Sequence, residues 1–368
     1  MNGPCRACAA KELDEILDLG AMPAADHFPP ATEPVAADPT HRLAMALCRR
    51  CGLAQLADDD TIAAEPRGLE PRALREQAAD AVARVADAGW LRGGATVREF
   101  GSPHGGAWAP LLTARGFTET PDQPADVVID SFGLMHEPDQ HSAVRARAAA
   151  LAPYGVLLLQ FHSLRAIVTH GQWNALRHGH FAYYSVPALR TLMASAGLRV
   201  MAAWEFDLYG GTVLVAAAAD PGDPLRLPAD PPGPLHRLVA AESGLIAPRN
   251  LASLQEAADS QALALRTWLE YETSVDHRVY AYGAASRAVA LFARAGAHLG
   301  LLCAVADASP AKHGRRMPGT DIPIITPAEL VAAHPDRVLL TVPDLLPEVR
   351  SEFPSLESAW VVEVPRPP

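Results

Sequence analysis

The fold class is decided by residues 96–106, which read Thr96-Val97-Arg98-Glu99-Phe100-Gly101-Ser102-Pro103-His104-Gly105-Gly106. The first five are typical of a strand, and the glycines form a turn before an apolar helix at 107–114. A strand that runs into a glycine-rich turn lets the backbone approach a nucleotide. Many tight turns look the same, so this stretch predicts strand, turn and helix and leaves the ligand open.

The segments around this stretch continue the alternation of strands and helices. Residues 71–90 have the apolar spacing of a helix. Further along the chain, ADVVID at 125–130 and GVLLLQF at 155–161 are typical of buried strands, with a helix at 144–152 between them. The region therefore predicts an alternating β/α sheet.

A second β/α unit follows a proline-rich stretch. Residues 219–234 (ADPGDPLRLPADPPGP) cannot sustain a helix or a central strand, and we interpret them as a linker. After a helical pattern to about Tyr271, the sequence predicts a strand, a turn, a helix and a strand at 278–282, 283–286, 287–295 and 301–306. Asp307 lies 24 positions after Gly283, a spacing that suits a ribose-binding acid and equally an aspartate that caps the next turn.

The N-terminal region holds four of the five cysteines, as Cys5-Arg6-Ala7-Cys8 and Cys48-Arg49-Arg50-Cys51. Two C-x2-C pairs supply the four thiolates of a tetrahedral structural zinc site. A redox disulfide is the alternative, but the paired spacing without a secretory signal favours metal. The predicted zinc ligands are Cys5, Cys8, Cys48 and Cys51. Cys303, in an apolar run, is expected to be a small buried side chain.

Composition and charge limit the classes of partner. The chain has 368 residues, enough for two or three domains, and its 49% apolar content is ample for packed cores. A net charge of -11, without a basic cluster interleaved with aromatics, argues against nucleic acid and suits small-molecule work. We expect a cytoplasmic protein, because the N-terminus is no signal peptide and no apolar run approaches the roughly 20 residues of a membrane helix.

Three sets of motifs occur along the chain. They are CRAC, LDLGAMPAADHF and LCRRCGLAQL at 5–8, 17–28 and 47–56; GHFAYYSVPALRTLMASAGLRV and YGGTVLVAA at 179–200 and 209–217; and YGAASRA and VADASPAKHGRRMPGTDIPI at 282–288 and 305–324. In content and order they resemble the C-methyltransferases that act on nucleotide-activated keto-sugars in antibiotic biosynthesis. The resemblance covers nearly the whole chain.

The resemblance implies an enzyme of secondary metabolism with a small-molecule substrate such as a nucleotide-sugar, and no membrane or nucleic acid partner. The implied fold is α/β: a small zinc module, a truncated Rossmann-like S-adenosylmethionine (SAM) methyltransferase domain and a C-terminal Rossmann-like domain. The corresponding boundaries are 1–68, 69–218, a proline-rich linker and helical connector at 219–271, and a substrate- or nucleotide-binding domain at 272–368.

The SAM domain departs from the family in its turn and its length. Where the family has Glu-Ile-Gly-Ser-Asn-Asp-Gly, Pro103 removes a backbone donor and His104 replaces a carboxylate. Only residues 118–124 precede 125–130, which resembles the fourth strand of a SAM domain, so the second and third strands are expected to be absent. Asp130 has the spacing of a ribose acid but the context of that later strand. The resemblance implies cofactor contacts at Glu99, Gly101, Gly105 and His136, and SAM binding is predicted to be weak or absent.

The catalytic motif Tyr-His-Glu-His-Phe of the family falls on residues 177–181, RHGHF. Carbon methylation next to a ketone needs a base and a hydrogen-bond donor for the enolate oxygen, and histidine suits the base role near neutral pH. The resemblance gives His180 the base role. His178, Tyr183 and Tyr209 are further catalytic candidates, Tyr209 in place of the histidine of His-Gly-Gly-Ser. Without the resemblance, the same residues would suggest a partly buried aromatic strand edge.

In the resembling family the C-terminal domain helps to bind the nucleotide. The residues implied near phosphate are Arg177, Gly283, Ser286, Lys312, Arg315 and Arg316, since turns and guanidinium groups suit anionic oxygens. A loop such as KHGRR is also compatible with an ordinary solvated turn. Three functions stay open: a SAM-dependent C-methyltransferase, a SAM-independent enzyme of epimerisation, elimination or cyclisation, and a non-catalytic binding partner.

Overall fold

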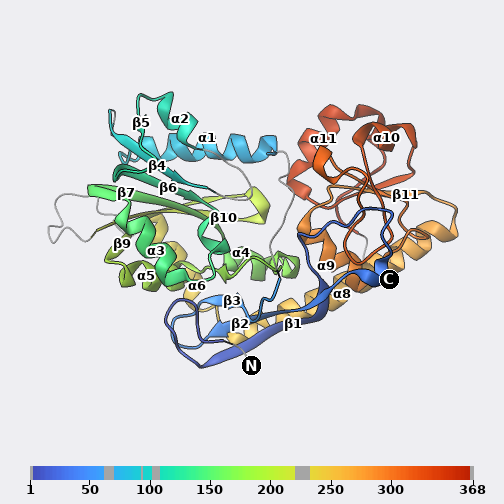
Figure 1. Ribbon diagram of the computed structural model, residues 1–368, viewed down its shortest axis with the longest axis horizontal. Coiled ribbons are helices and arrows are strands. Elements are labelled where there is room, and N and C mark those ends of the chain that lie inside the picture. Colours follow the sequence, from blue (N-terminus) through green and yellow to red (C-terminus); the bar gives the residue numbers. More distant parts are fainter. Residues whose placement is uncertain (1–2, 62–69, 93, 102–107, 220–232, 365–368) are drawn as a thin grey trace.

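The computed structural model describes residues 3–61, 70–92, 94–101, 108–219 and 233–364. Within them the strands form three sheets, of four, six and five strands (Figure 1). The four-stranded sheet lies beneath the six-stranded sheet in the figure, and the five-stranded sheet lies beside both. The chain is therefore α/β in its two larger parts, as the sequence predicts.

The N-terminal sheet is antiparallel and has the order β1-β2-β3-β8. Its strands are β1 (Leu13–Pro23), β2 (Thr40–Cys48), β3 (Ala54–Leu56) and β8 (Ala182–Tyr183). Ala54 pairs with Tyr183 and Gln55 with Ala182, so the last strand comes from the middle of the chain. The N-terminal module is thus completed by residues far outside its predicted boundaries.

The central sheet has the order β5-β4-β6-β7-β10-β9. Its strands are β4 (Thr96–Phe100), β5 (Thr118–Glu119), β6 (Ala125–Ser131), β7 (Leu151–His162), β9 (Leu198–Phe206) and β10 (Thr212–Ala219). β5, β4, β6 and β7 run parallel, and β10 is antiparallel to both β7 and β9. The carboxyl ends of β4, β6 and β7 therefore share one edge, where α/β sheets bind ligands.

β5 corrects the expectation that the second strand is absent. Thr118 and Glu119 pair in parallel with Thr96 and Val97 of β4. Two residues are too few to show an apolar strand pattern in the sequence. In the described part of the chain β5 is the edge strand on this side of the sheet.

Helices cover both faces of the central sheet (Figure 1). Val127 and Ile129 of β6 pack in the same cluster as Val82 and Val85 of α1 (Arg72–Asp87). Val128, on the other face, packs in the cluster of α3 (Gln140–Ala149), α5 (Val186–Ser195) and α6 (Pro234–Ser243). This alternation is the period-2 pattern of a strand buried on both faces.

The C-terminal sheet is parallel throughout and has the order β13-β12-β11-β14-β15. Its strands are β11 (Val279–Tyr282), β12 (Val305–Ala306), β13 (Ile324–Ile325), β14 (Arg337–Leu340) and β15 (Trp360–Val361). The chain order reverses between β11 and β14, and ligands bind at such a reversal in open α/β sheets. The long helix α8 (Ser253–Ser274) packs against both α9 (Ser286–Ala295) and β1.

The remaining helices are α2 (Ala109–Thr113), α4 (Leu164–Thr169), α7 (Pro248–Leu251), α10 (Pro327–Ala332) and α11 (Leu346–Glu352). Most of the predicted linker, residues 220–232, lies outside the described residues. Among the residues that are described, no helix has the length and apolar character needed to cross a membrane.

Candidate functional site

A cleft of about 690 Å³ lies between the central and C-terminal sheets. Phe132 and His162, at the carboxyl ends of β6 and β7, line it from the central domain. Tyr282, Asp307 and Val342, at or just beyond the ends of β11, β12 and β14, line it from the C-terminal domain. The ligand-binding edges of the two sheets therefore share one cavity.

His180 lies in this cleft and is held by Arg177. The Nε–H of Arg177 donates to Nε2 of His180 at 2.7 Å, and its Nη1 donates to the hydroxyl of Ser286. Ser286 is the first residue of α9. Arg177 thus connects the predicted base directly to the amino end of a C-terminal helix.

His136, which the resemblance implies as a cofactor contact, lies beside His180. The two rings meet edge to face, 4.4 Å apart, and Nδ1 of His136 is 3.0 Å from the carbonyl oxygen of Gly179. Burial, and then the charge of Arg177, lowers the pKa of His136 to about 4. A neutral imidazole therefore packs against the predicted base near neutral pH.

Tyr183 and Tyr209 line the cleft in different ways. The Tyr183 hydroxyl accepts from the backbone N–H of Arg177 at 3.1 Å and donates to the carbonyl of Ala175 at 3.3 Å, so it holds the 175–183 segment in place. Tyr209 has a φ of 57°, rare for a residue with a side chain. Its backbone N–H donates to Asp344 of the C-terminal domain at 2.9 Å. Burial raises the pKa of both phenols, so each stays protonated near neutral pH.

His162 is a cleft residue that was not among the site residues predicted from the sequence. It ends β7, and its Nε2 is 2.9 Å from Oε1 of Gln172. Burial, followed by the charges of Arg287 and Arg177, lowers the pKa of His162 to about 3. Its position as a polar residue that ends a buried strand is the signal that could have found it.

The guanidinium-bearing residues Arg177 and Arg287 both line the cleft. Burial, and then the charge of Arg177, lowers the pKa of Arg287. The Arg287 guanidinium lies 5.4 Å from the centre of the Tyr209 ring. Guanidinium groups and the amino end of a helix are groups that suit anionic oxygens, and here both occur in one cleft.

Gly283 and Lys312 shape the same end of the cleft. Gly283 has a φ of 95°, and a Cβ there would lie 2.6 Å from the Thr341 hydroxyl, so the turn after β11 requires glycine. The Lys312 ammonium donates to the carbonyl of Ala284 at 2.8 Å and lies 4.0 Å from Asp307. Asp307 accepts from the amides of Ala284 and Ser309, both at 2.8 Å, which is the turn-capping role.

Three predicted site residues lie elsewhere. Arg316 is buried and donates to both oxygens of Asp38 at 2.6 Å, so it joins the C-terminal domain to the N-terminal segment. Arg315 donates to the carbonyl of Phe28 at 2.6 Å. The Nε2 of His178 is 3.2 Å from the carbonyl of Arg42. None of the three lines the cleft, and each is engaged by the N-terminal segment.

Two acidic residues, Glu99 of β4 and Glu119 of β5, lie on the strands that flank the expected SAM site. Glu99 accepts from the amides of Trp108 and Ala109, each at 2.8 Å, and so fixes the residues that follow the glycine turn. Glu119 is exposed and ends β5, 18 residues after Gly101, which is close to the spacing of about 20 residues that is typical of a ribose-binding acid. Burial raises the pKa of Glu99, and the charge of Glu119 adds to this effect. The predicted features Pro103, His104 and Gly105 lie outside the described residues.

Asp130 is structural, as its sequence context suggests. It is fully buried, pairs with Arg147 at 2.8 Å and accepts from the amides of Gly133 and Leu134 at 2.7 and 3.0 Å. These bonds hold the loop after β6, which carries His136. Asp130 is therefore not available as a ribose ligand.

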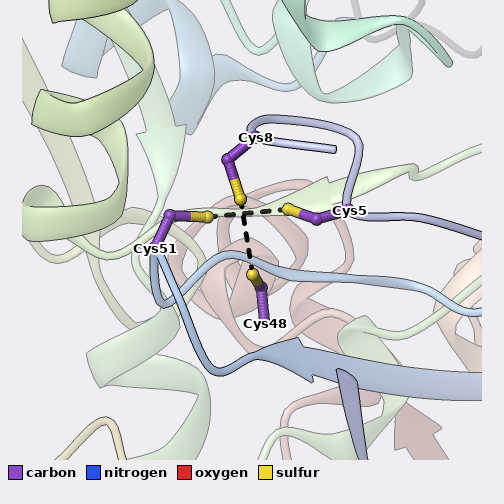
Figure 2. Close-up of side chains that lie close together, drawn as sticks. All are labelled: Cys5, Cys8, Cys48 and Cys51. Carbon is purple, nitrogen blue, oxygen red and sulfur yellow. Dashed lines mark hydrogen bonds between the residues drawn. The ribbon is translucent and has the colours of Figure 1, made fainter. Parts of the chain in front are cut away.

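The four N-terminal cysteines converge, as Figure 2 shows. Their sulfur atoms all lie within 4.8 Å of one another, with 3.5 Å between Cys5 and Cys51 and 3.6 Å between Cys8 and Cys48. Zinc–sulfur bonds of about 2.3 Å in a tetrahedron separate the sulfurs by about 3.8 Å, so the donor set fits zinc. All four are free thiols, and the hydrogen bond with Cys51 lowers the pKa of Cys5 to about 5.

Comparison with known families matches all three parts of the chain. Residues 5–61 match a zinc binding domain, 118–203 a methyltransferase domain and 208–365 the C-methyltransferase C-terminal domain. The C-methyltransferase NovU of Streptomyces niveus is 24% identical across 99% of this chain and 96% of its own length. The chain belongs to the C-methyltransferase family. As a C-methyltransferase family member it is an enzyme, and its N-terminal cysteine cluster is a zinc-binding module.

Several solved methyltransferases are similar to parts of this chain. Magnesium protoporphyrin IX methyltransferase from Synechocystis, solved with bound S-adenosylhomocysteine, is 12% identical, with a TM-score of 0.30 over 40% of this chain and 84% of its own. A Burkholderia thailandensis 1,6-didemethyltoxoflavin-N1-methyltransferase is 15% identical, with a TM-score of 0.30 over 47% of this chain and 98% of its own.

Proposed function

We propose that this C-methyltransferase transfers a methyl group from SAM to a carbon next to a ketone in a nucleotide-linked keto-sugar, in the cytoplasm where both are present. The observation that carries the proposal is Arg177, which hydrogen-bonds the predicted base His180 and, through Ser286, the amino end of α9. The base and the anion-binding groups are therefore coupled in one cleft.

The substrate diphosphate binds Arg287, Arg177 and the start of α9. An anionic oxygen competes with Nε2 of His180 for the Arg177 guanidinium, because a charge-assisted bond is stronger than a bond to a neutral imidazole. Nε2 then takes the proton from the carbon next to the ketone. The electron pair of the broken C–H bond forms the enolate, whose oxygen accepts from the Tyr209 phenol.

SAM, when bound, supplies the methyl group that the enolate carbon receives. Glu119 would hold the ribose hydroxyls of SAM, and Glu99 would fix the turn beneath it. β5 has two residues and is the last strand on its side of the described sheet. The protein surface available to contact adenosine is therefore smaller than in a complete Rossmann-type domain. We therefore expect methyl transfer with weak SAM affinity.

The function is tested by incubating the purified chain with SAM and nucleotide-linked 4-keto sugars and measuring methylated product and S-adenosylhomocysteine. His180→Asn should lower the rate on the order of 10²- to 10⁴-fold, the usual effect of losing a general base. The matched control is His170→Asn, which removes an exposed histidine outside the cleft. Near wild-type turnover of His180→Asn would remove His180 from the mechanism.

A SAM-independent reaction at the same cleft is the second candidate. The short β5 favours this candidate, because the predicted base and the predicted anion-binding residues are all present, whereas the strand beside the expected adenosine site has only two residues. In that case the chain would epimerise, cyclise or eliminate from its substrate with no SAM present. Product formed at the same rate with and without SAM, and carrying no added methyl group, would select this reaction.

A further inference from the structure

We propose that Asp344 is a positioning residue for the reaction: it holds the backbone of Tyr209 and so links the placement of this phenol to the domain that binds the nucleotide. The inference rests on the proposed function, because it needs the Tyr209 phenol to donate to the enolate oxygen. Asp344 does not line the cleft itself. It acts through Tyr209, from whose backbone N–H it accepts a hydrogen bond at 2.9 Å.

Tyr209 has a backbone conformation that tyrosine rarely adopts. Its φ and ψ are 57° and 26°, in the left-handed region, and the next two residues, Gly210 and Gly211, have φ values of 77° and 145°. A residue with a side chain is strained in this region and keeps the conformation only where its surroundings hold it, most often at functional sites. The conformation of Tyr209 therefore depends on bonds from outside the turn.

Two hydrogen bonds from different domains hold this residue. The N–H of Tyr209 donates to Asp344 of the C-terminal domain, and its carbonyl accepts from Nε2 of Gln172 in the central domain at 3.1 Å. A Cβ at Gly210 would lie 2.1 Å from the same Nε2, so this amide packs directly on the turn. The Tyr209 ring meets the Phe132 ring edge to face, with centroids 5.9 Å apart, and both residues line the cleft. The phenol is thus fixed at the cleft wall from both domains.

Asp344 belongs to a segment that also contacts the turn before α9. This segment, residues 341–345, follows β14. Its first residue, Thr341, donates from its hydroxyl to the carbonyl of Gly283 at 2.5 Å. Gly283 lies on the turn that leads into α9, where the proposed function places the diphosphate. One short segment therefore contacts the proposed diphosphate site at one end and Tyr209 at the other.

This arrangement predicts that the nucleotide contributes to the rate and not only to binding. A diphosphate at the start of α9 stabilises the 341–345 segment, and Asp344 then holds Tyr209 where the enolate oxygen forms. Binding energy from a remote part of a substrate that is used in this way raises kcat. A keto-sugar without its nucleotide should therefore react more slowly even at saturating concentration.

Hydrogen exchange tests the link without any turnover. The amides of residues 207–211 are followed by mass spectrometry in the full chain, with and without UDP at ten times its Kd. UDP should slow their exchange about tenfold, the factor for opening that requires release of the nucleotide. Asp344→Ala should lose this protection, whereas Asp344→Asn, which keeps an acceptor oxygen, should retain it. The matched control is Asp336→Ala, which removes an acid that accepts a backbone N–H at 2.8 Å outside the cleft.

A double-mutant cycle tests whether Asp344 acts through Tyr209. With a nucleotide-linked 4-keto sugar, Tyr209→Phe should lower kcat on the order of 10²- to 10³-fold, the usual effect of losing one donor to an oxyanion. Asp344→Ala should lower kcat about 10- to 100-fold by misplacing the phenol, with KM within about twofold, and Asp344→Asn should restore most of the rate. In the Tyr209→Phe background, Asp344→Ala should cost less than about threefold more, because the two residues act as a unit.

The inference would be overturned by three results: wild-type exchange at 207–211 that UDP does not slow, protection that survives in Asp344→Ala, or fully multiplicative losses in the double variant. Each would leave the proposed function standing, because it concerns how Tyr209 is held and not whether the substrate reacts. Failure of UDP to bind would contradict the nucleotide-linked substrate and the inference together. If UDP binds but the wild-type chain forms no product, the proposed function fails, and the exchange data alone decide the link between Asp344 and Tyr209.

Discussion

Replacing the buried cleft histidine His162 by glutamine should make the protein less sensitive to mild acid. The fold holds His162 neutral down to a pKa of about 3, whereas an unfolded chain titrates it near 6.5. Below pH 6.5 the unfolded state therefore binds a proton that the folded state does not bind. Stability must rise with pH in this window and fall as the pH is lowered through it.

The magnitude follows from the two pKa values. One proton taken up on unfolding gives a slope of about 1.4 kcal/mol per pH unit between about pH 6 and pH 3.5. His136, with a pKa lowered to about 4, contributes a similar slope above about pH 4.5. Glu242, whose pKa burial raises to about 7, opposes them, since the folded state binds its proton first. His162→Gln removes only the first contribution, so at pH 5 it should recover about 2 kcal/mol relative to pH 7.

The assay is urea denaturation of wild type, His162→Gln and the exposed control His170→Gln at several pH values from 5 to 7. Between pH 5 and 7 the plot of unfolding free energy against pH should be flatter for His162→Gln by about 1 kcal/mol per pH unit on average, with most of the difference below about pH 6. Any loss of stability at pH 7 from the Gln172 contact shifts the plot without changing its slope. Parallel plots for all three proteins would refute the assignment of His162 as a buried neutral group.

Three further predictions concern the zinc module, the cofactor edge and the domain junction. Purified protein should contain one zinc by elemental analysis, and Cys48→Ser/Cys51→Ser should lose both the metal and stability; unchanged zinc in that variant would rule out the site. SAM should bind with a Kd weaker than low micromolar by calorimetry, and Glu119→Gln should weaken it about tenfold further by removing a charged acceptor; low-micromolar binding would show that other residues rebuild the pocket. Arg316→Met should lower the free energy of unfolding by about 3 to 5 kcal/mol in urea denaturation, because it leaves the buried Asp38 carboxylate without its partner. Arg316→Met/Asp38→Leu should recover much of this stability. Equal stability of the two variants would contradict a buried ion pair.

Much of the fold was predictable because its signals are local. The strand expected at 96–100 is β4, Thr96–Phe100, and the cysteine spacing brought four sulfur atoms together as predicted. β5 and β8 escaped prediction because two residues carry no periodicity, and each exists only by pairing with a strand already in place.

The site was less predictable because its contacts join distant segments. Arg315 and Arg316 look like phosphate ligands in the sequence, yet their partners Phe28 and Asp38 lie near the other end of the chain. His180 and Arg177 were found through the family resemblance, but the bond of Arg177 to Ser286 depends on how two domains meet. Residue identity predicts which groups can act, and only the fold decides which of them share a cavity.

The strand β8 has a consequence for protein engineering. It begins two residues after His180 and closes the sheet of the zinc module, and Arg6, between Cys5 and Cys8, stacks over Phe181 at 4.7 Å. The N-terminal module and the segment that carries His180 are therefore joined by strand pairing and side-chain packing. A chimera that exchanges the N-terminal module with that of a relative would therefore have to carry residues 177–184 along with it.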